Sequence, residues 1–155
     1  ERPGLLAVIG SRVKLLGRRI ERRPARHYPG RVFATLVSLS LGLSIYDSQC
    51  GAKLFRASPP MRTVFAEPFR SRWIFDVEIL ARMQRLARLG AIPPVETVVY
   101  EYVLSHWRDV AGSKLKPTDF LRAALELAEI ARHTRRRTPP ETETVLPPSQ
   151  PPNHA

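Results

Sequence analysis

The order of one amphipathic helix and one β-branched segment near the middle of the chain sets the expected fold class. Between residues 73 and 89 apolar side chains recur at helical spacing, and Gly90 is a natural stop for that helix. Pro93 and Pro94 separate it from residues 97–103, whose β-branched and aromatic side chains favour a strand. A helix that leads through a short break into a strand is typical of an α/β layered fold.

Other segments carry local signals that suit the same class. The pattern predicts a buried strand at residues 5–9, a buried helix at 31–43, a short strand at 53–55, a short helix at 58–65 and a last helix beginning at 118 or 119. A basic, mobile loop is expected between residues 12 and 31, and a polar loop at 105–116. The chain is long enough for one domain, which we expect at residues 1–137.

The charge of the chain points to anionic partners. The 155 residues hold 25 Lys and Arg against 14 Asp and Glu. Residues 138–155 contain six of the fifteen prolines and no Lys or Arg, so we expect a disordered Pro-rich tail. The part expected to fold then carries 25 basic against 12 acidic residues, a net charge of +13. A nucleic acid, an anionic bilayer and a phosphorylated substrate all remain open on this ground.

Several kinds of site are disfavoured by residue usage. One cysteine excludes an internal disulfide framework and a Cys-rich zinc site, and favours the cytosolic side. The longest uncharged run, residues 32–46, is shorter than the roughly 20 residues that span a bilayer, so no transmembrane helix is expected. The four histidines lie far apart and the chain has no Asp-x-Asp pair, so local sequence assembles no metal site.

Two arginines are candidates for binding a phosphate. Arg12 follows Gly10 and Ser11 at the end of the expected first strand, and Arg31 lies at the expected start of a helix. Facing guanidinium groups can hold a phosphate through bidentate, charge-assisted hydrogen bonds. The alternative is that both are exposed, solvated side chains.

Candidate carboxylates lie in a turn and on the amphipathic helix. Asp47 comes just beyond an apolar helix, in a turn with Gln49 and Cys50, where it can face a cleft or simply form the turn. Cys50 is expected to be a small buried side chain rather than a nucleophile. Asp76 and Glu78 are two residues apart on a helix and so point in different directions. We expect Asp76 to face the cleft and Glu78 to form a salt bridge.

A further candidate segment combines a large ring with a turn suited to an anion. Trp107 is followed by a Gly-Ser-Lys sequence that ends at Lys114. A surface Trp beside a solvated Lys is the alternative.

Taken together and in this order, the motifs resemble the C-terminal half of family-two glycosyltransferases of the dolichyl-phosphate glucosyltransferase and mannosyltransferase type. The resemblance lies in Gly-Ser-Arg at 10–12, Arg31, Asp-Ser-Gln-Cys-Gly-Ala-Lys at 47–53, Arg-Trp-Ile-Phe-Asp-Val-Glu at 72–78 and Trp-Arg-Asp-Val-Ala-Gly-Ser-Lys-Leu at 107–115. The family pattern has Thr and Phe where this chain has Ser48 and Ala52, which are mild departures. The match covers roughly residues 5 to 130.

The resemblance implies a fold and an activity. It implies the C-terminal portion of a GT-A, Rossmann-like fold and an inverting transfer of a hexose from a nucleotide sugar to a polyprenyl phosphate at the cytoplasmic face of a membrane. Mg²⁺ or Mn²⁺ would serve the complete enzyme, with its ligands in a nucleotide-binding half that precedes residue 1. This chain would supply the acceptor-binding half and, tested alone, would not turn over.

The same resemblance assigns roles to residues. Arg12 and Arg31 would hold the acceptor phosphate, and Asp47 with Gln49 would line the reacting centre. Asp76 would be a further catalytic residue, and Lys53 and Lys114 would bind the acceptor phosphate. Partners would be polyprenyl phosphate, a nucleotide sugar and an anionic membrane surface.

Two rival functions do not require catalysis. A basic module could bind an anionic membrane or nucleic acid, although aromatic side chains are few and are not interleaved with the basic runs as a nucleic-acid surface requires. A noncatalytic remnant could instead serve only to bind a partner.

Overall fold

The computed structural model describes residues 3–21, 24–108 and 117–136, which form a mixed α/β structure. The expected disordered tail and the polar residues 109–116, Lys114 among them, lie outside these ranges. The expected α/β class is confirmed for the described part of the chain.

A three-stranded sheet carries the N-terminal strand at its centre. β1 (Ala7–Ser11) pairs antiparallel with β3 (Lys53–Phe55) on one side and parallel with β4 (Val99–Val103) on the other. In this register Ile9 lies between Lys53 and Glu101. The sheet therefore brings three segments that are far apart in sequence to the same strand end.

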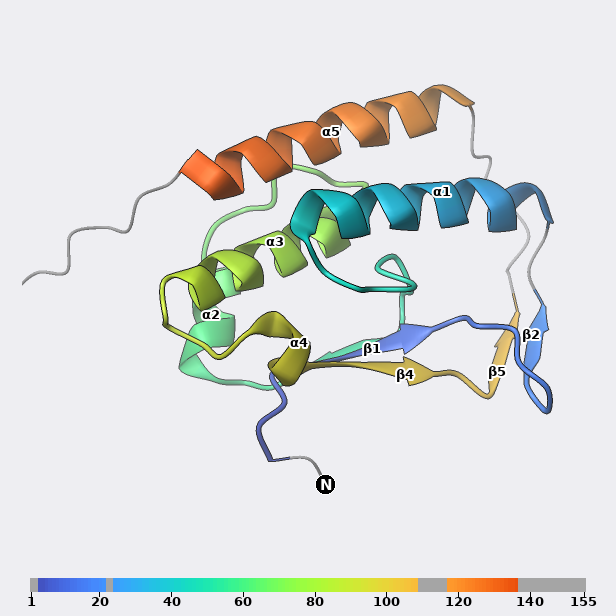
Figure 1. The fold of residues 1–155 in the computed structure, drawn as a ribbon, viewed down its shortest axis with the longest axis horizontal. Helices are drawn as coiled ribbons and strands as arrows, with labels where there is room; N and C mark the ends of the chain where they lie inside the picture. The colour runs from blue at the N-terminus through green and yellow to red at the C-terminus, as the bar shows by residue number, and fades with distance from the viewer. Residues whose placement is uncertain (1–2, 22–23, 109–116, 137–155) are drawn as a thin grey trace, which may run out of the picture.

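A second, two-stranded sheet extends one end of the molecule. β2 (Arg19–Glu21) pairs in parallel with β5 (His106–Arg108), with Ile20 opposite Trp107. Ile20 is buried while its two neighbours are exposed, the alternation expected of a strand with one covered face. Figure 1 shows this small sheet at the end of the molecule toward which β1 and β4 point.

Helices cover one face of the central sheet. α1 (Pro24–Leu41) and α3 (Phe75–Arg88) lie above β1 and β4, and α5 (Pro117–Arg136) packs against both helices (Figure 1). α2 (Pro59–Phe65) packs on α3, and the single turn α4 (Val95–Val98) leads into β4. The core combines aliphatic side chains from these layers, including Ile9, Phe33, Val37, Ile74, Val77, Leu80, Met83, Leu127 and Ile130.

Two expectations about the segment before residue 41 are wrong in part. The segment between residues 12 and 31 is not one loop, because it contains β2 and the beginning of α1. α1 starts at Pro24 and continues through Pro29, so Arg31 lies inside a helix rather than at its start. Proline has a backbone angle suited to a helix and removes only one hydrogen bond here. Buried side chains farther along the helix, such as Phe33 and Val37, stabilise it by packing.

The expected loop and strand near the end of the sheet also differ from the structure. Residues 106–108 form β5, which the sequence did not predict, because a three-residue strand is defined by its pairing with β2 rather than by its own side chains. Residues 97 and 98 belong to α4, in which Thr97 bonds to the Pro94 carbonyl through both its N–H and its hydroxyl. The strand itself starts at Val99.

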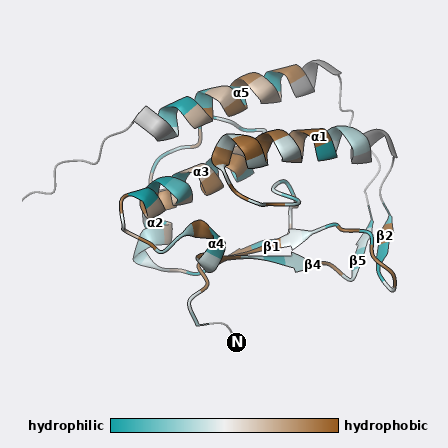
Figure 2. Ribbon diagram, viewed as in Figure 1, coloured by the Kyte–Doolittle hydropathy of each residue, from teal (hydrophilic) through white to brown (hydrophobic). Residues whose placement is uncertain are grey.

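An apolar stripe on α1 faces away from the core. Val32, Leu36 and Leu39 lie on one side of the helix and are exposed, Val32 by 64% and Leu39 by 74%. Figure 2 shows hydrophobic residues along α1, and Phe33, Val37 and Leu41 on its other side are buried. Across residues 3–21, 24–108 and 117–136, no helix has the length and hydropathy needed to cross a bilayer. The exposure of Val32, Leu36 and Leu39 puts the stripe on the surface of the protein.

Candidate functional site

The first two motifs meet at the end of β1. The Gly10 N–H donates to the Ala52 carbonyl at 2.7 Å. A Cβ atom at Gly10 would stand 3.0 Å from the Ala52 Cβ and 3.1 Å from the Cys50 sulfur. Only glycine lets the turn approach the strand this closely. The Gly-Ser-Arg and Asp-Ser-Gln-Cys-Gly segments are thus packed together, and each fixes the position of the other.

Arg12 and Asp47 form a bidentate ion pair across this junction. The guanidinium donates from Nε to Oδ2 at 2.6 Å and from Nη2 to Oδ1 at 2.7 Å, and the Arg12 backbone N–H donates to Oδ2 at 3.1 Å. The two side chains are 14% and 8% exposed, so this is a largely desolvated pair with fork-to-fork geometry. The Arg12 guanidinium also lies over the Trp107 ring, 5.3 Å from its centroid.

Lys53 and Asp76 form a second buried ion pair beside the first. Lys53 Nζ lies 3.0 Å from Asp76 Oδ1 and also donates to the Cys50 carbonyl. Burial raises the pKa of Asp76, and the charge of Lys53 opposes that rise. Cys50 links the two ion pairs, because its carbonyl accepts from Lys53 and its N–H donates to the Asp47 carbonyl at 3.3 Å. We call Arg12, Asp47, Lys53 and Asp76 the two-pair cluster.

Arg31 approaches the same turn from α1. Its Nη1 donates to the Tyr46 carbonyl at 3.2 Å, and its guanidinium stacks on the Tyr46 ring at 3.8 Å from the centroid. Glu101 on β4 holds the turn in place, because its carboxylate accepts hydrogen bonds from the backbone N–H groups of Tyr46 and Asp47 at 2.9 and 2.8 Å. Arg12 and Arg31 therefore bind consecutive residues of one turn, Asp47 and Tyr46.

Small polar and sulfur-bearing side chains fill the space around the cluster. Burial raises the pKa of the Cys50 thiol, with Asp47 adding to the rise and Arg12 and Lys53 opposing it. Cys50 is thus a protonated, buried side chain, as expected from the sequence. The hydroxyls of Ser11 and Ser48 are buried as well, and no described residue accepts from or donates to them.

The structure brings together five of the seven predicted site residues, namely Arg12, Arg31, Asp47, Lys53 and Asp76. Gln49 lies in the same turn and is half-buried. Lys114 lies outside the described residues. Glu78 forms a salt bridge with Arg82 at 2.8 Å, as expected. The catalytic and phosphate-binding roles of these residues remain predictions.

Glu101 was not singled out from the sequence. It is an acid at the centre of an otherwise apolar and aromatic segment, Val-Tyr-Glu-Tyr-Val, and that position is the signal that could have found it. A carboxylate on a half-buried strand requires hydrogen-bond donors. Which donors it receives depends on the fold, since its partners lie 54 and 55 residues away.

Comparison with known proteins gives one consistent family. The chain is 33% identical over 129 residues to a dolichyl-phosphate beta-glucosyltransferase of Trichomonas vaginalis, covering 83% of this chain and 35% of the relative. It is 40% identical over 73 residues to the Homo sapiens dolichyl-phosphate beta-glucosyltransferase, covering 47% and 19% of the two chains. The Saccharomyces cerevisiae enzyme of the same name is 33% identical over 109 residues, covering 69% of this chain and 29% of the relative.

The matched region is limited in extent. No family model matches the chain, and no solved structure matches it. The chain spans about a third of the length of the first of its curated relatives. Within that span, the similarity to several such enzymes supports assignment of this chain to the dolichyl-phosphate glycosyltransferase family.

Proposed function

We propose that the chain supplies the acceptor-binding half of an enzyme that transfers a hexose from a nucleotide sugar to a polyprenyl phosphate. The observation that carries this proposal is the convergence of Arg12, Arg31 and the Asp47 turn at the end of β1, beside the pair of Lys53 and Asp76. The relatives are named dolichyl-phosphate beta-glucosyltransferases, which supports glucose as the hexose and dolichyl phosphate as the acceptor. The complete enzyme would have a GT-A fold, of which this chain forms the C-terminal portion.

The chemistry needs positioning more than a strong base. A phosphate monoester has a second pKa near about 6, so at neutral pH the acceptor oxygen already carries negative charge. That oxygen would attack the anomeric carbon, and the bond from this carbon to the nucleotide diphosphate would break on the opposite face. With an α-linked donor the product would be the β-linked sugar phosphate, which makes the transfer inverting. Holding the two reactants in this geometry supplies a large share of such a rate enhancement.

Arg12 has a specific role in this proposal. Its guanidinium fork is engaged by the Asp47 carboxylate through two short hydrogen bonds. A phosphate presents the same kind of paired oxygens to the same fork. We therefore propose that the acceptor phosphate competes with Asp47 for Arg12, while Arg31 binds the phosphate from the α1 side. Asp47 and Gln49 would then line the reacting centre, with Asp76, Lys53 and Lys114 around it.

The described residues do not fit a metal site. The carboxylates of Asp47 and Asp76 are already paired with Arg12 and Lys53. No set of three His, Cys, Asp or Glu side chains within residues 3–21, 24–108 and 117–136 is arranged to hold an ion. No step proposed for this chain passes through a metal. The Mg²⁺ or Mn²⁺ implied by the resemblance is expected in the nucleotide-binding half of the complete enzyme.

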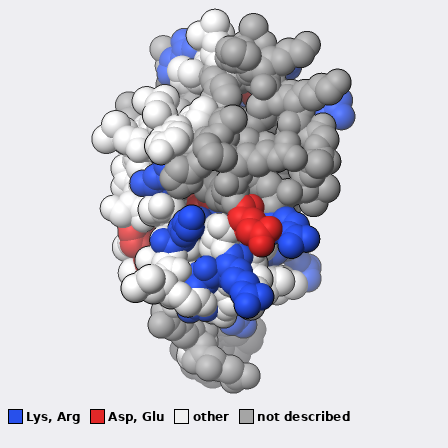
Figure 3. Space-filling model, turned by 90° about the vertical axis from the view of Figure 1, so that its right-hand side faces the viewer, with Lys and Arg blue, Asp and Glu red and all other residues white. Residues whose placement is uncertain are grey.

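A peripheral position on the cytoplasmic face of a membrane suits these surfaces. The apolar stripe of Val32, Leu36 and Leu39 is exposed, and Leu16 is fully exposed in the loop before β2. Figure 3 shows Lys and Arg side chains gathered around an acidic group on the end of the molecule that carries β2 and β5. Proteins that lie on anionic bilayers typically expose both apolar and basic side chains. A lipid acceptor would be reached from the same surface.

Binding of polyprenyl phosphate tests the proposal. The chain would be titrated with a short polyprenyl phosphate in neutral detergent micelles, with anionic lipid and DNA as competitors. Arg12→Lys keeps the charge but loses the fork, and Arg31→Gln removes the second cation; each should weaken binding about tenfold or more. Asp47→Asn should tighten binding, because it removes the competing carboxylate. Arg62→Gln on α2 is the matched control, and it should leave the affinity unchanged.

The same titration decides for or against the rival function. A noncatalytic basic module would bind anionic lipid and DNA as well as polyprenyl phosphate, would ignore both arginine substitutions and would lose all binding in modest salt. That set of results would refute the proposal. Selective binding, with opposite effects of Arg12→Lys and Asp47→Asn, would support it.

A further inference from the structure

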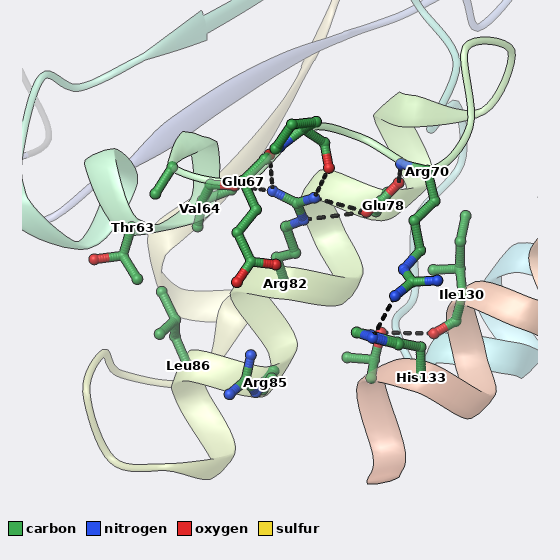
Figure 4. A pocket seen from close by; sticks show the side chains of 13 residues that line it. Thr63, Val64, Glu67, Arg70, Glu78, Arg82, Arg85, Leu86, Ile130 and His133 are labelled. Carbon is green, nitrogen blue, oxygen red and sulfur yellow. Dashed lines mark hydrogen bonds and ion pairs between the residues drawn. The ribbon is translucent and has the colours of Figure 1, made fainter. Parts of the chain in front are cut away.

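A second basic pocket lies outside the two-pair cluster. It is a cavity of about 400 Å³ between α2, α3 and α5, and its wall includes three arginines and one histidine (Figure 4). The lining contains none of the cluster residues. Its charged side chains are Arg70, Arg82 and Arg85 against Glu67 and Glu78, an excess of one positive charge with His133 neutral.

Arg82 holds the pocket wall together. Its guanidinium donates to the carbonyls of Val64, Glu67 and Pro68 at 2.7 to 2.8 Å and to the Glu78 carboxylate at 2.8 Å. Glu78 in turn accepts the backbone N–H of Arg70 at 2.8 Å. Figure 4 shows these bonds at one end of the pocket. This ion pair is satisfied within the protein and has a structural role.

Arg85 differs from Arg82 in having donors to spare. Its Nε is buried, and no described residue accepts a hydrogen bond from it. A charged donor without an acceptor costs free energy, which an anion in the pocket would recover in part by binding the terminal nitrogens of the same guanidinium. Its guanidinium lies in the part of the pocket bordered by Leu86 and His133 (Figure 4).

Arg70 brings a second guanidinium to the same space. It contacts His133 Nε2 at 2.7 Å, where the ring nitrogen accepts, and Glu129 at 3.3 Å. The Arg70 and Glu129 side chains are 46% and 59% exposed, so their ion pair is screened by water and exchanges at little cost. Arg70 can therefore turn a donor toward an anion that enters the pocket.

We propose that this pocket binds a phosphate group, held between Arg85 and Arg70. A tetrahedral phosphate offers several acceptor oxygens, which match two guanidinium groups that come from α3 and from the segment between α2 and α3. The volume admits a phosphate ester with part of its substituent. The site is separate from the acceptor site proposed above and does not depend on it.

Phosphate binding to the full chain is measured by ³¹P NMR and by the rise in thermal unfolding temperature with added inorganic phosphate. Arg85→Met removes the unpartnered donor but keeps an apolar stem, and it should weaken phosphate binding about tenfold or more. Glu67→Gln should strengthen binding by removing a negative charge from the wall. Arg88→Met is the matched control, because Arg88 lies on the same helix outside the pocket and bonds only to the Gln84 carbonyl.

The outcomes separate binding from folding and one phosphate source from another. Without phosphate, Arg85→Met should unfold at or slightly above the temperature of the parent, because the unpartnered buried donor is gone, and it should gain less from added phosphate. A soluble short-chain phosphatidic acid is the second probe: saturable binding of this lipid alone, lost in Arg85→Met, assigns the pocket to a lipid headgroup. Binding of inorganic phosphate with the same loss assigns it to a free phosphate. No binding of either probe, or equal loss in Arg88→Met, overturns the proposal.

Discussion

Replacing Lys53 with Met should destabilise the fold by an amount that depends on pH. Lys53 and Asp76 lie 3.0 Å apart, and their side chains are only 7% and 12% exposed. Removing one member of such a pair leaves the other charge buried and costs about 3–5 kcal/mol. We expect a loss of that order in the free energy of unfolding at neutral pH.

The sign of the pH dependence follows from the pKa of Asp76. Burial already raises that pKa above its ordinary value of 3.8, and Lys53 opposes the rise. Without Lys53, the Asp76 carboxyl keeps its proton in the folded state at pH values at which it is ionised in the unfolded state. The folded state of the variant is then favoured at low pH, and its stability falls as pH rises from about 3.8 to the new folded pKa. Over that window the slope is about 1.4 kcal/mol per pH unit.

Urea unfolding followed by circular dichroism between pH 4 and 8 measures this difference between the variant and the parent. The double variant Lys53→Met, Asp76→Leu is the control, since it removes both charges and should recover much of the stability with no added slope. A deficit of Lys53→Met that stays constant from pH 4 to 8 would refute the reasoning. Equal deficits in the single and double variants would also do so.

Three further substitutions or reactions test other parts of the structure. Arg82→Met should lower the free energy of unfolding by about 3–5 kcal/mol, because it leaves Glu78 buried without its cation and three carbonyls without a donor. In the same urea titration the control Arg88→Met should change this free energy by less than about 0.5 kcal/mol. Leu39→Glu should reduce sedimentation with anionic liposomes several-fold without lowering the thermal unfolding temperature, since the side chain is exposed; unchanged sedimentation would exclude the stripe as the docking surface. Cys50 in the folded chain should react with iodoacetamide at pH 8 at least about tenfold more slowly than in urea, because burial raises its pKa and blocks access, and equal rates would contradict that account.

Elements with strong local signals were predicted well from the sequence. The helix expected at residues 73–89 is α3 at 75–88, with its stop at Gly90, which has a positive φ of 71°. α2 begins after Ser58 with Pro59 as its first residue, as expected, although the Ser58 hydroxyl donates to the Arg56 carbonyl and does not cap the helix. The strand at 53–55 has the expected bounds. For the two helices, neighbours in sequence supply the periodicity or the breaker that decides the structure, whereas the three-residue strand also requires its pairing with β1.

Elements that depend on distant partners could not be predicted in this way. β2 and β5 are three-residue strands that exist because they pair with each other, and their residues lie 87 positions apart. α1 begins before Arg31 because packing farther along the helix outweighs the local effect of Pro29. No local pattern encodes a balance of that kind.

The sequence by itself determined the types of chemistry available: an excess of basic residues, the motifs around Arg12 and Asp47, and a family resemblance that comparison with known proteins supports. It did not determine which charges neutralise each other. Only the tertiary structure paired Arg12 with Asp47 and Lys53 with Asp76, and gave the Asp47 turn its support from Glu101. The physical reason is that a pair's strength depends on distance and burial, and both arise when β1, β3 and β4 bring separate segments to one strand end.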